Sequence, residues 1–377
     1  KGITLIALVI TIIILLILAG ISISALTNQG LFKNAKAAQN ATEKAKEEQG
    51  QRLNEYEDEI NKYLNNANED EKIGLITDNI NKELSKTDNT KLKDEKGNRI
   101  VVPAGFKIVN GATTVDKGIV IEDVTETATK GSQFVWIPVG TITKSDGTTA
   151  TITLGRYDFD ATTGKESAYS GTYVEEDSND SSTLKKCGNT IAKNITKFKN
   201  SVATNGGYYI GRYEARTATA RSAAGNALTQ ITEKGTENVY NYVTQLQAAQ
   251  LSQNMYTSNK FTSDLMNSYA WDTATVFIQN CGTNAKYSRQ ISLNTSLLQT
   301  GTNSLTDTSK IDVQCNIYDM ASNIEEWTTE TSYDSDSPCV YRGGYCISSN
   351  VFTSNRSNSY TSGRGNVGFR PLLYVNV

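Results

Sequence analysis

The sequence predicts an α+β protein in which a long N-terminal α-helix, apolar at first and amphipathic afterwards, precedes a loop-rich domain. Three observations lead to this prediction. The chain has no charged side chain between Lys1 and Lys33. Residues 33–65 are rich in Ala, Lys, Glu and Gln and contain no proline, which gives a high helix propensity. From Ile100 onward, short runs of β-branched and aromatic residues alternate with Gly, Asp and Asn, as strands and turns do.

The composition excludes several classes of function. The 377 residues include no histidine and carry a net charge of −3. Without imidazole there is no Ser-His-Asp or Cys-His catalysis and no histidine-ligated zinc or haem. Nucleic-acid binding needs a concentrated basic face, so we expect no nucleic-acid partner.

The apolar segment, residues 3–26, has the length of a bilayer-spanning helix, which needs about 20 apolar residues. Only Thr4 and Thr11 interrupt the run from Ile3 to Ala19. A secretory signal peptide has a shorter apolar stretch of about 7–15 residues, and a core helix of a soluble domain rarely lacks polar residues over such a length. The side chains that we expect in a filament core or a membrane are Ile3, Leu5, Ile6, Ala7, Leu8, Val9, Ile10, Ile12, Ile13, Ile14, Leu15, Leu16, Ile17 and Leu18.

The helix is expected to continue with a water-facing half. Apolar residues recur there at spacings of three and four, which places them on one stripe of a helix. We therefore predict one helical rod over residues 1–65, a polar linker over 66–98 and a head over 99–377. The positions of the stripe are Leu53, Tyr56, Ile60, Tyr63 and Leu64.

The first residues also carry a family motif. Residues 2–10 read GITLIALVI, which resembles the prepilin signature of type IV pilins and pseudopilins, where a peptidase cuts after the glycine. The resemblance covers about the first 60 residues. It implies a filament whose core is a bundle of these helices, with the subunit held in the membrane before assembly. Ala7 stands where this family usually has a glutamate.

In the head we expect short strands, two helices and many loops. Residues 158–205 are rich in Ser, Thr, Asp and Asn and are expected to form a long surface excursion. Residues 206–211 are interpreted as a half-buried strand rather than a phosphate-binding loop, because no Lys-Ser/Thr follows the glycines. The helices are expected near 240–256 and 263–280, the second with Leu265, Tyr269, Thr273 and Phe277 on one face. The expected strands are Ile100–Val102, Phe106–Val109, Ile119–Ile121, Phe134–Val139 and Thr151–Leu154.

Five strings in the head occur in one order, namely GGYYIGRYE, YAWD, NIYDMASNIEEW, VYRGG and GFR. Together they resemble the formylglycine-generating-enzyme (sulfatase-modifying) family, whose fold is a loop-rich variant of the C-type lectin fold. The resemblance implies a C-type-lectin-like head over roughly residues 100–377. The same fold is that of the variable proteins of diversity-generating retroelements, whose variable stretch lies between the Arg-Gly-Gly and the closing Gly-Phe-Arg. The residues that match the structural motif are Asn323, Glu326, Trp327, Arg342, Gly343, Gly344, Gly368, Phe369 and Arg370.

The resemblance implies a copper site of two cysteines, separated by four residues, just after the Gly-Gly of an active member. Here only Cys346 follows Gly344, and Cys339 precedes the motif. The related iron enzymes need histidines. We therefore expect no catalytic residues and no enzyme activity. The sequence leaves open a Cys339–Cys346 disulfide, another pairing among the five cysteines, or buried thiols.

Family members often hold calcium near the Asn-x-x-Glu-Trp string, which Asn323 and Glu326 match. One carboxylate makes a weak calcium site. We favour an Asn323 that turns the backbone and a Glu326 paired with Arg342 or Arg370. Trp327 is expected in the core and Glu325 in solvent. No cofactor is expected, and calcium stays open.

Residues 345–366 are the best candidate for ligand contact. Their Ser, Asn, Tyr, Arg and Gly composition is shared with antibody paratopes, in which rigid aromatic anchors join adaptable hydrogen-bonding groups. An ordinary polar loop has a similar composition, and the family resemblance favours binding. The candidate residues are Tyr345, Asn350, Phe352, Asn355, Arg356, Asn358, Tyr360 and Arg364.

The sequence therefore predicts a subunit of a type IV pilus-like filament at the cell surface. The subunit would polymerise with itself through its N-terminal helices, after insertion in the membrane. Its head would serve adhesion to an unknown protein or glycan without catalysis. Two alternatives stay open: a membrane-anchored binding protein that does not polymerise, and an oxidase of the sulfatase-modifying type.

Overall fold

The computed structural model describes residues 2–28, 36, 38–46, 49, 73–76, 84–109, 111, 113–125, 127–175, 194–301, 304–348 and 350–377. In the first helix the side chains are described over residues 7–22. The chain divides into two units, Lys1–Ile73 and Gly74–Val377. The side chains of Ile3, Leu5 and Ile6, the predicted stripe over residues 53–64, and Cys187 lie outside the described residues.

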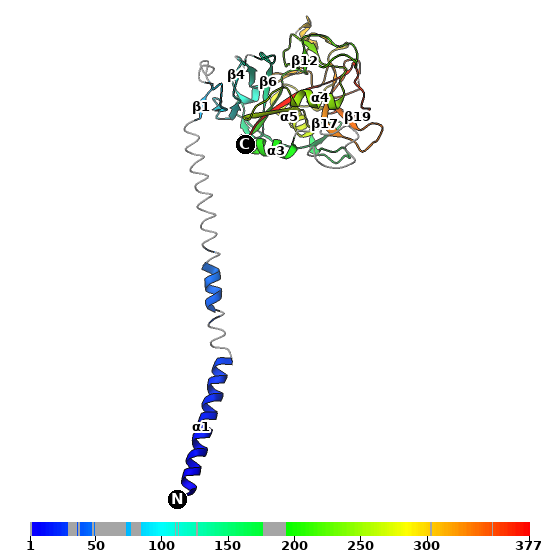
Figure 1. The fold of residues 1–377 in the computed structure, drawn as a ribbon. Coiled ribbons are helices and arrows are strands. Elements are labelled where there is room, and N and C mark those ends of the chain that lie inside the picture. Colours follow the sequence, from blue (N-terminus) through cyan, green and yellow to red (C-terminus); the bar gives the residue numbers. More distant parts are fainter. Residues whose placement is uncertain are drawn as a thin grey trace. The chain divides into compact units, whose positions relative to one another are not determined.

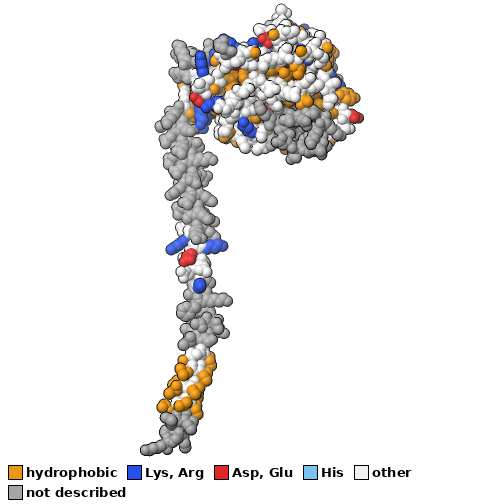
Figure 2. Space-filling model, in the orientation of Figure 1, with side chains coloured by type: hydrophobic (Ala, Val, Ile, Leu, Met, Phe, Trp, Pro, Cys, Tyr) orange, Lys and Arg blue, Asp and Glu red, His pale blue; other side chains and the backbone are white. Residues whose placement is uncertain are grey.

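The first unit contains α1, Gly2–Asn28, an apolar helix without a polar face. Its described side chains, residues 7–22, are all exposed; Leu16, for example, is 66% exposed. The Thr11 hydroxyl donates a hydrogen bond to the Ala7 carbonyl oxygen (2.7 Å), so this polar group is satisfied within the helix. Figure 2 shows the hydrophobic side chains covering this part of the surface.

The predicted fold class, with one long N-terminal helix over residues 1–65, is wrong. Helix α1 ends at Asn28, where Thr27 and Asn28 have low helix propensity and Gly30 follows in the sequence. Helical residues are also described over 38–46. No helix in the described residues combines the length and the apolar character that crossing a membrane requires. The described part of the second unit consists mainly of strands and loops with short helices.

The second unit is built on a six-stranded antiparallel sheet, in the order β14-β21-β11-β6-β5-β4. The last strand of the chain, β21, thus lies inside the sheet, and Figure 1 shows the C-terminus beside α3. The strands are β4 (Phe106–Ile108), β5 (Val120–Asp123), β6 (Gln133–Pro138), β11 (Gly207–Gly211), β14 (Phe261–Leu265) and β21 (Pro371–Val375).

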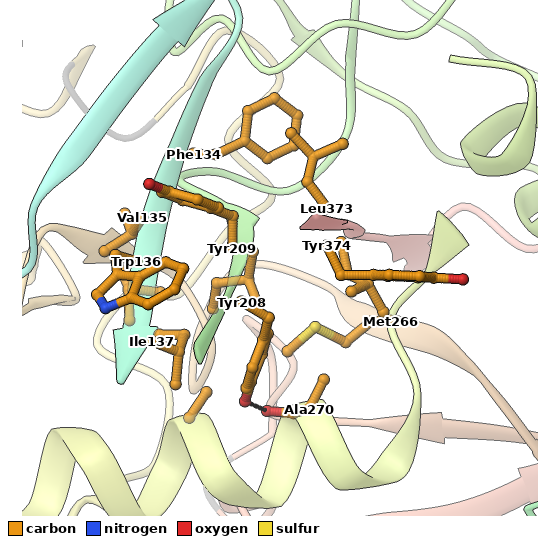
Figure 3. Packing of buried hydrophobic residues seen from close by; sticks show 14 of the residues in the cluster. Phe134, Val135, Trp136, Ile137, Tyr208, Tyr209, Met266, Ala270, Leu373 and Tyr374 are labelled. Atoms are coloured by element: carbon orange, nitrogen blue, oxygen red, sulfur yellow. Dashed lines mark hydrogen bonds between the residues drawn. The ribbon is translucent and has the colours of Figure 1, made fainter. Parts of the chain in front are cut away.

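Strand β11 lies at the centre of the core, and all five of its residues are buried. The prediction of a half-buried strand is therefore wrong. Successive side chains point to opposite faces of a sheet, and both faces are covered here. On one face the Tyr208 hydroxyl donates to the Ala270 carbonyl of α5 (2.7 Å; Figure 3). On the other face the Tyr209 hydroxyl donates to the Val101 carbonyl (3.0 Å), while its ring packs against Trp136 at 4.9 Å. Each buried phenol thus satisfies its polar end.

A second sheet has the order β19-β18-β17-β20, in which β17 and β20 are parallel and the other pairs antiparallel. Figure 1 shows β17 and β19 in the orange part of the chain. The strands of this sheet carry seven of the motif and ligand candidates, namely Glu326, Trp327, Arg342, Arg356, Asn358, Gly368 and Phe369. Its strands are β17 (Glu325–Thr331), β18 (Cys339–Arg342), β19 (Arg356–Ser359) and β20 (Val367–Phe369).

Three helices of this unit begin at side-chain caps. Asn194 caps α3 (Ile195–Asn205), Thr244 and Gln247 form a capping box at α4 (Gln245–Gln253), and Asn267 caps α5 (Ser268–Cys281). Such caps satisfy backbone N–H groups that lack partners in the first turn. The helix predicted over 263–280 therefore begins later, because Phe261–Leu265 forms β14, and Leu265 does not share a helix face with Tyr269.

The remaining elements are short. The predicted surface excursion over 158–205 is wrong at its second described end, where helix α3 buries Phe198. At its first end the β9–β10 hairpin lies largely at the surface. The other strands are β1 (Gly74–Leu75), β2 (Thr90–Lys93), β3 (Arg99–Val102), β7 (Gly140–Thr143), β8 (Thr149–Ile152), β9 (Tyr157–Phe159), β10 (Glu166–Ala168), β12 (Arg216–Thr217), β13 (Asn238–Val239), β15 (Val313–Gln314) and β16 (Ile317–Tyr318). The 3₁₀ turns are η2 (Val115–Lys117), η4 (Tyr287–Arg289) and η6 (Thr308–Lys310).

Candidate functional site

An open cavity of about 360 Å³ lies between the β9–β10 hairpin, η4 and the segment that leads into β19. Its wall combines five aromatic rings with a small number of charged and polar groups, which is typical of small-molecule sites. We call it the aromatic cavity. Its lining residues are Tyr157, Asp158, Phe159, Tyr169, Tyr173, Arg289, Phe352, Ser354, Asn355 and Arg356.

The β9–β10 hairpin supplies one wall. Tyr157 and Phe159 are two residues apart on β9 and so share one face of the strand, with ring centroids 6.4 Å apart. The Asp160 carboxylate accepts hydrogen bonds from the backbone N–H groups of residues 162 and 163 at the turn. Beyond β10, the backbone N–H of Tyr173 donates to the Tyr169 hydroxyl (3.0 Å). The aromatic side chains of this wall are therefore held by the hairpin itself.

A buried ion-pair network forms the floor. The Arg356 guanidinium donates to Asp272 Oδ2 at 2.6 Å and to the Glu330 carboxylate at 3.0 Å. Arg342 pairs with the same two carboxylates, and Arg156 pairs with Glu330. Three arginines thus share two carboxylates, which compensates charges that would be costly to bury alone.

The same network ties the hairpin to the second sheet. Asp272 also accepts a hydrogen bond from the Tyr157 backbone N–H (2.9 Å), and the Arg156 and Arg356 guanidinium carbons lie 4.3 and 4.0 Å from the centre of the Tyr169 ring. These distances are typical of cation–π contacts. Burial of the charged form, the first of several causes, raises the pKa of Tyr157 and Tyr173 above the usual range. Both phenols are therefore protonated at neutral pH.

Arg289 lies on the opposite wall. Its guanidinium carbon is 3.5 Å from the centre of the Phe352 ring, and Phe352 is fixed to this wall by a β-bridge to Ile291. Among the described residues, the Arg289 guanidinium has no hydrogen bond or ion pair, unlike that of Arg356. The described part of the cavity therefore presents one stacked cation that makes no hydrogen bond. The pKa of Asp160 is lowered first by a backbone hydrogen bond and last by the charge of Arg289.

The structure brings together half of the predicted ligand-binding residues. Phe352, Asn355 and Arg356 line the aromatic cavity, and Asn358 accepts a hydrogen bond from the Tyr173 hydroxyl (3.1 Å). The other four, Tyr345, Asn350, Tyr360 and Arg364, are not among its lining residues.

Sequence reasoning missed the hairpin aromatics and Arg289. The concentration of Tyr157, Tyr169 and Tyr173 around Phe159 in a polar segment is a signal that could have indicated the first wall. No local pattern marks Arg289.

The family-motif residues are buried and structural. Arg370 pairs with Glu326 through two contacts of 2.6 and 3.1 Å, which confirms one of the two predicted pairings. Arg342 instead joins the network under the cavity. Asn323 has a φ of 64° and turns the backbone as predicted. Trp327 is fully buried, also as predicted, and its indole N–H donates to the Val243 carbonyl (2.8 Å).

Glu325 is buried, so the prediction that it faces solvent is wrong. It is 7% exposed and accepts a hydrogen bond from the Asn366 side chain (3.1 Å). Its strand, β17, lies between β18 and β20 and is covered on both faces. Burial raises the pKa of Glu325 to about 7, against the opposing charge of Arg364.

Glycine contacts explain the remainder of the motif. A Cβ on Gly344 would collide with the Ala321 carbonyl, and one on Gly368 would collide with the Ile324 side chain. Gly343 has a φ of 84°, a conformation that favours glycine. The Phe369 ring packs against Tyr240 at 5.6 Å. These residues hold the second sheet against its surroundings and do not line the aromatic cavity.

The side-chain oxygens of Asn323 and Glu326, the weak calcium candidates, already accept hydrogen bonds within the protein. Asn323 Oδ1 accepts from the Leu298 backbone N–H (2.8 Å), Asn323 Nδ2 donates to Glu214 (2.6 Å), and both Glu326 oxygens bind Arg370. Within the described residues no group of three or more Cys, Asp or Glu side chains is arranged to hold a metal.

Cys346 is a buried thiol, so the Cys339–Cys346 disulfide that the sequence left open does not form. Burial raises the pKa of the Cys346 thiol. A thiolate, the form that attacks substrates and binds metals, is thereby disfavoured at this position.

Comparisons with known proteins found no matching family model, no matching curated protein and no matching solved structure.

Proposed function

We propose that this protein is a non-catalytic recognition protein of the cell surface, which binds a ligand in the aromatic cavity and assembles with copies of itself through α1. The aromatic cavity carries the proposal. Its aromatic walls supply apolar contact area at a low cost in side-chain entropy, and its few polar groups orient a ligand.

The floor of the cavity suits binding because it is rigid. Arg356 is fixed by two carboxylates that also bind Arg342, and its side chain is 8% exposed. A site whose groups are already held in place loses little entropy when a ligand binds.

Chemical features of the cavity favour binding over catalysis. The raised pKa values of Tyr157 and Tyr173 make their phenols poor bases at neutral pH. Cys346, which stands nearest in sequence to the copper position of the enzyme family, is buried and is not a lining residue. An oxidase of the sulfatase-modifying type is therefore the weaker alternative.

Self-assembly is proposed from the surface of α1. A helix that is apolar all round is stable only when all its sides are covered, and a single partner helix covers one side. Several further copies of α1 around each helix would cover the exposed apolar side chains over residues 8–18.

Electron microscopy tests the assembly. The full chain is purified in detergent, the detergent is removed, and the material is stained and labelled with an antibody to the 74–377 unit. We expect labelled fibres. A chain that stays a detergent-bound monomer, or that enters lipid vesicles without forming fibres, would favour the anchored, non-polymerising alternative.

Ligand arrays test the recognition. The full chain in detergent is applied to glycan and peptide arrays, beside a Phe159→Ala variant that removes one cavity wall and a Tyr333→Ala control on the exposed surface. We expect binding that the first variant loses and the control keeps. Binding that survives Phe159→Ala would place recognition elsewhere on the protein.

A further inference from the structure

We infer that the aromatic cavity takes an acidic sugar, with the carboxylate of the sugar bound by Arg289 and its ring packed against the aromatic walls. This inference rests on the proposed function and names its class of ligand. Two observations support it. Within the described part of the chain, Arg289 makes no hydrogen bond whereas Arg356 makes several, and the other lining groups suit a ring that carries hydroxyl groups.

Arg289 has the properties of an anion anchor. Its guanidinium lies on the Phe352 ring at 3.5 Å, which limits its motion while the N–H groups at its edge stay available. Among the described residues, no carboxylate or carbonyl oxygen accepts from them. A guanidinium presents its N–H groups in a planar fork that matches a carboxylate with two parallel hydrogen bonds.

Arg356 is not available for this role. Its Nε and one Nη bind Glu330 and Asp272, and its other Nη contacts the Tyr157 carbonyl at 3.4 Å. Each of its three nitrogens thus already donates within the protein. The cavity therefore offers one site for one negative charge, beside Arg289.

The rest of the cavity suits a ring that carries hydroxyl groups. A sugar ring has apolar C–H faces, which pack on aromatic side chains, and a hydroxyl edge, which needs acceptors and amides. The Asp158 side chain is 41% exposed, and its Oδ1, 4.0 Å from Arg356 Nη1, can accept from a hydroxyl, whereas its Oδ2 already accepts from Ser170 at 2.8 Å; Asn355 also lines the cavity. An acidic peptide side chain would reach Arg289 but would leave the aromatic walls uncovered, and Asp158 would repel a further negative charge.

The carboxylate methyl ester of each sugar gives a matched control, because it keeps the ring and removes the charge. The full chain in detergent is titrated with glucuronate, galacturonate and N-acetylneuraminate, and with their methyl esters. We expect at least one acid to bind at least about tenfold more tightly than its ester, as charge-assisted hydrogen bonds do over neutral ones.

Substitutions of Arg289 then test whether this residue recognises the carboxylate of the sugar. Arg289→Gln should remove the preference for the acid over the ester, and Arg289→Lys should retain part of the preference. Lys310→Gln, on the exposed η6 turn, is the control and should change neither affinity. Near-ultraviolet circular dichroism confirms that each variant is folded.

Three outcomes overturn the inference: equal affinity for acid and ester, no binding of any acidic sugar, and a preference that survives Arg289→Gln. Tighter binding of N-acetylglutamate amide than of the acidic sugars would also overturn it and would favour a peptide ligand. In each case, array binding that depends on Phe159 would leave the proposed function standing. Loss of array binding altogether would remove both.

Discussion

Asp272 on α5 and Arg356 on β19 form a buried ion pair, with 2.6 Å between Asp272 Oδ2 and Arg356 Nη2. The pair joins the helix to the edge strand of the second sheet directly under the aromatic cavity. Asp272 also binds Arg342 and the Tyr157 backbone N–H. One carboxylate thus connects helix α5, strands β18 and β19, and the hairpin.

Removal of this carboxylate should destabilise the 74–377 unit strongly. Asp272→Asn leaves Arg342 and Arg356 with less compensation in a buried place, and breaking a buried pair costs about 3–5 kcal/mol. Urea unfolding of the full chain, followed by near-ultraviolet circular dichroism, measures the change. The control Asp336→Asn alters an exposed carboxylate and should change the free energy of unfolding by less than about 0.5 kcal/mol. Equal stability of the two variants would show that the network does not hold the floor.

Gly344 should not tolerate a side chain. A Cβ there would meet the backbone carbonyl of Ala321, which cannot rotate away as a flexible side chain can. We expect Gly344→Ala to lower the free energy of unfolding by about 1–3 kcal/mol or more, the usual cost of overpacking.

Gly225→Ala is the matched control, because its Cβ would have no neighbour within 4 Å. The same urea titration compares the two variants. A Gly344→Ala variant as stable as Gly225→Ala would mean that the close approach of the second sheet to Ala321 is not required.

Buried glutamates should make the 74–377 unit less stable as the pH rises. Burial is the largest cause that raises the pKa of Glu175, Glu214 and Glu325, each from 4.5 to about 7. The folded state therefore binds protons more tightly than the unfolded state. The stability that this supplies is fully present below pH 4.5 and is lost as the pH rises through about 7.

Thermal unfolding at pH 5, 6, 7 and 8 measures this effect, and we expect the melting temperature to fall across the series. Glu325→Gln keeps a hydrogen-bond acceptor for Asn366 but cannot ionise, so it should make the decline shallower. Glu95→Gln, on an exposed side chain, should leave the decline as it is. A melting temperature that rises from pH 5 to pH 8 would contradict the prediction.

Local patterns predicted the core strands well. The strands expected at Ile100–Val102 and Phe134–Val139 are confirmed as β3 and β6, because dense β-branched and aromatic runs bounded by turn residues mark buried strands. The same patterns could not show that β11 is covered on both faces, since burial depends on which elements pack against it. Helix propensity also predicted one continuous helix over residues 1–65, whereas α1 spans Gly2–Asn28.

The aromatic cavity could be predicted only in part, because its walls come from distant segments. The composition of residues 345–366 indicated Phe352, Asn355 and Arg356. Arg289 is brought next to Phe352 by the β-bridge between Ile291 and Phe352. Such a long-range pairing cannot be predicted from a sequence periodicity. The ion-pair floor has the same origin, because Asp272, Glu330 and Arg356 are brought together by the fold.

Assembly should depend on the apolar surface of α1 and not on the fold of the 74–377 unit. Leu15 is 60% exposed, and in the proposed filament it would be buried among neighbouring helices. Leu15→Asp would place an unpaired charge in that contact, which is costly in an apolar environment. We expect the variant to form no fibres after detergent removal, while its near-ultraviolet circular dichroism stays unchanged.

Ile347→Asp is the control, because it places the same charge on an exposed position of the second unit, where Ile347 is 71% exposed. This variant should form fibres normally. Fibres of Leu15→Asp as abundant as those of Ile347→Asp would show that α1 is not the surface through which copies associate.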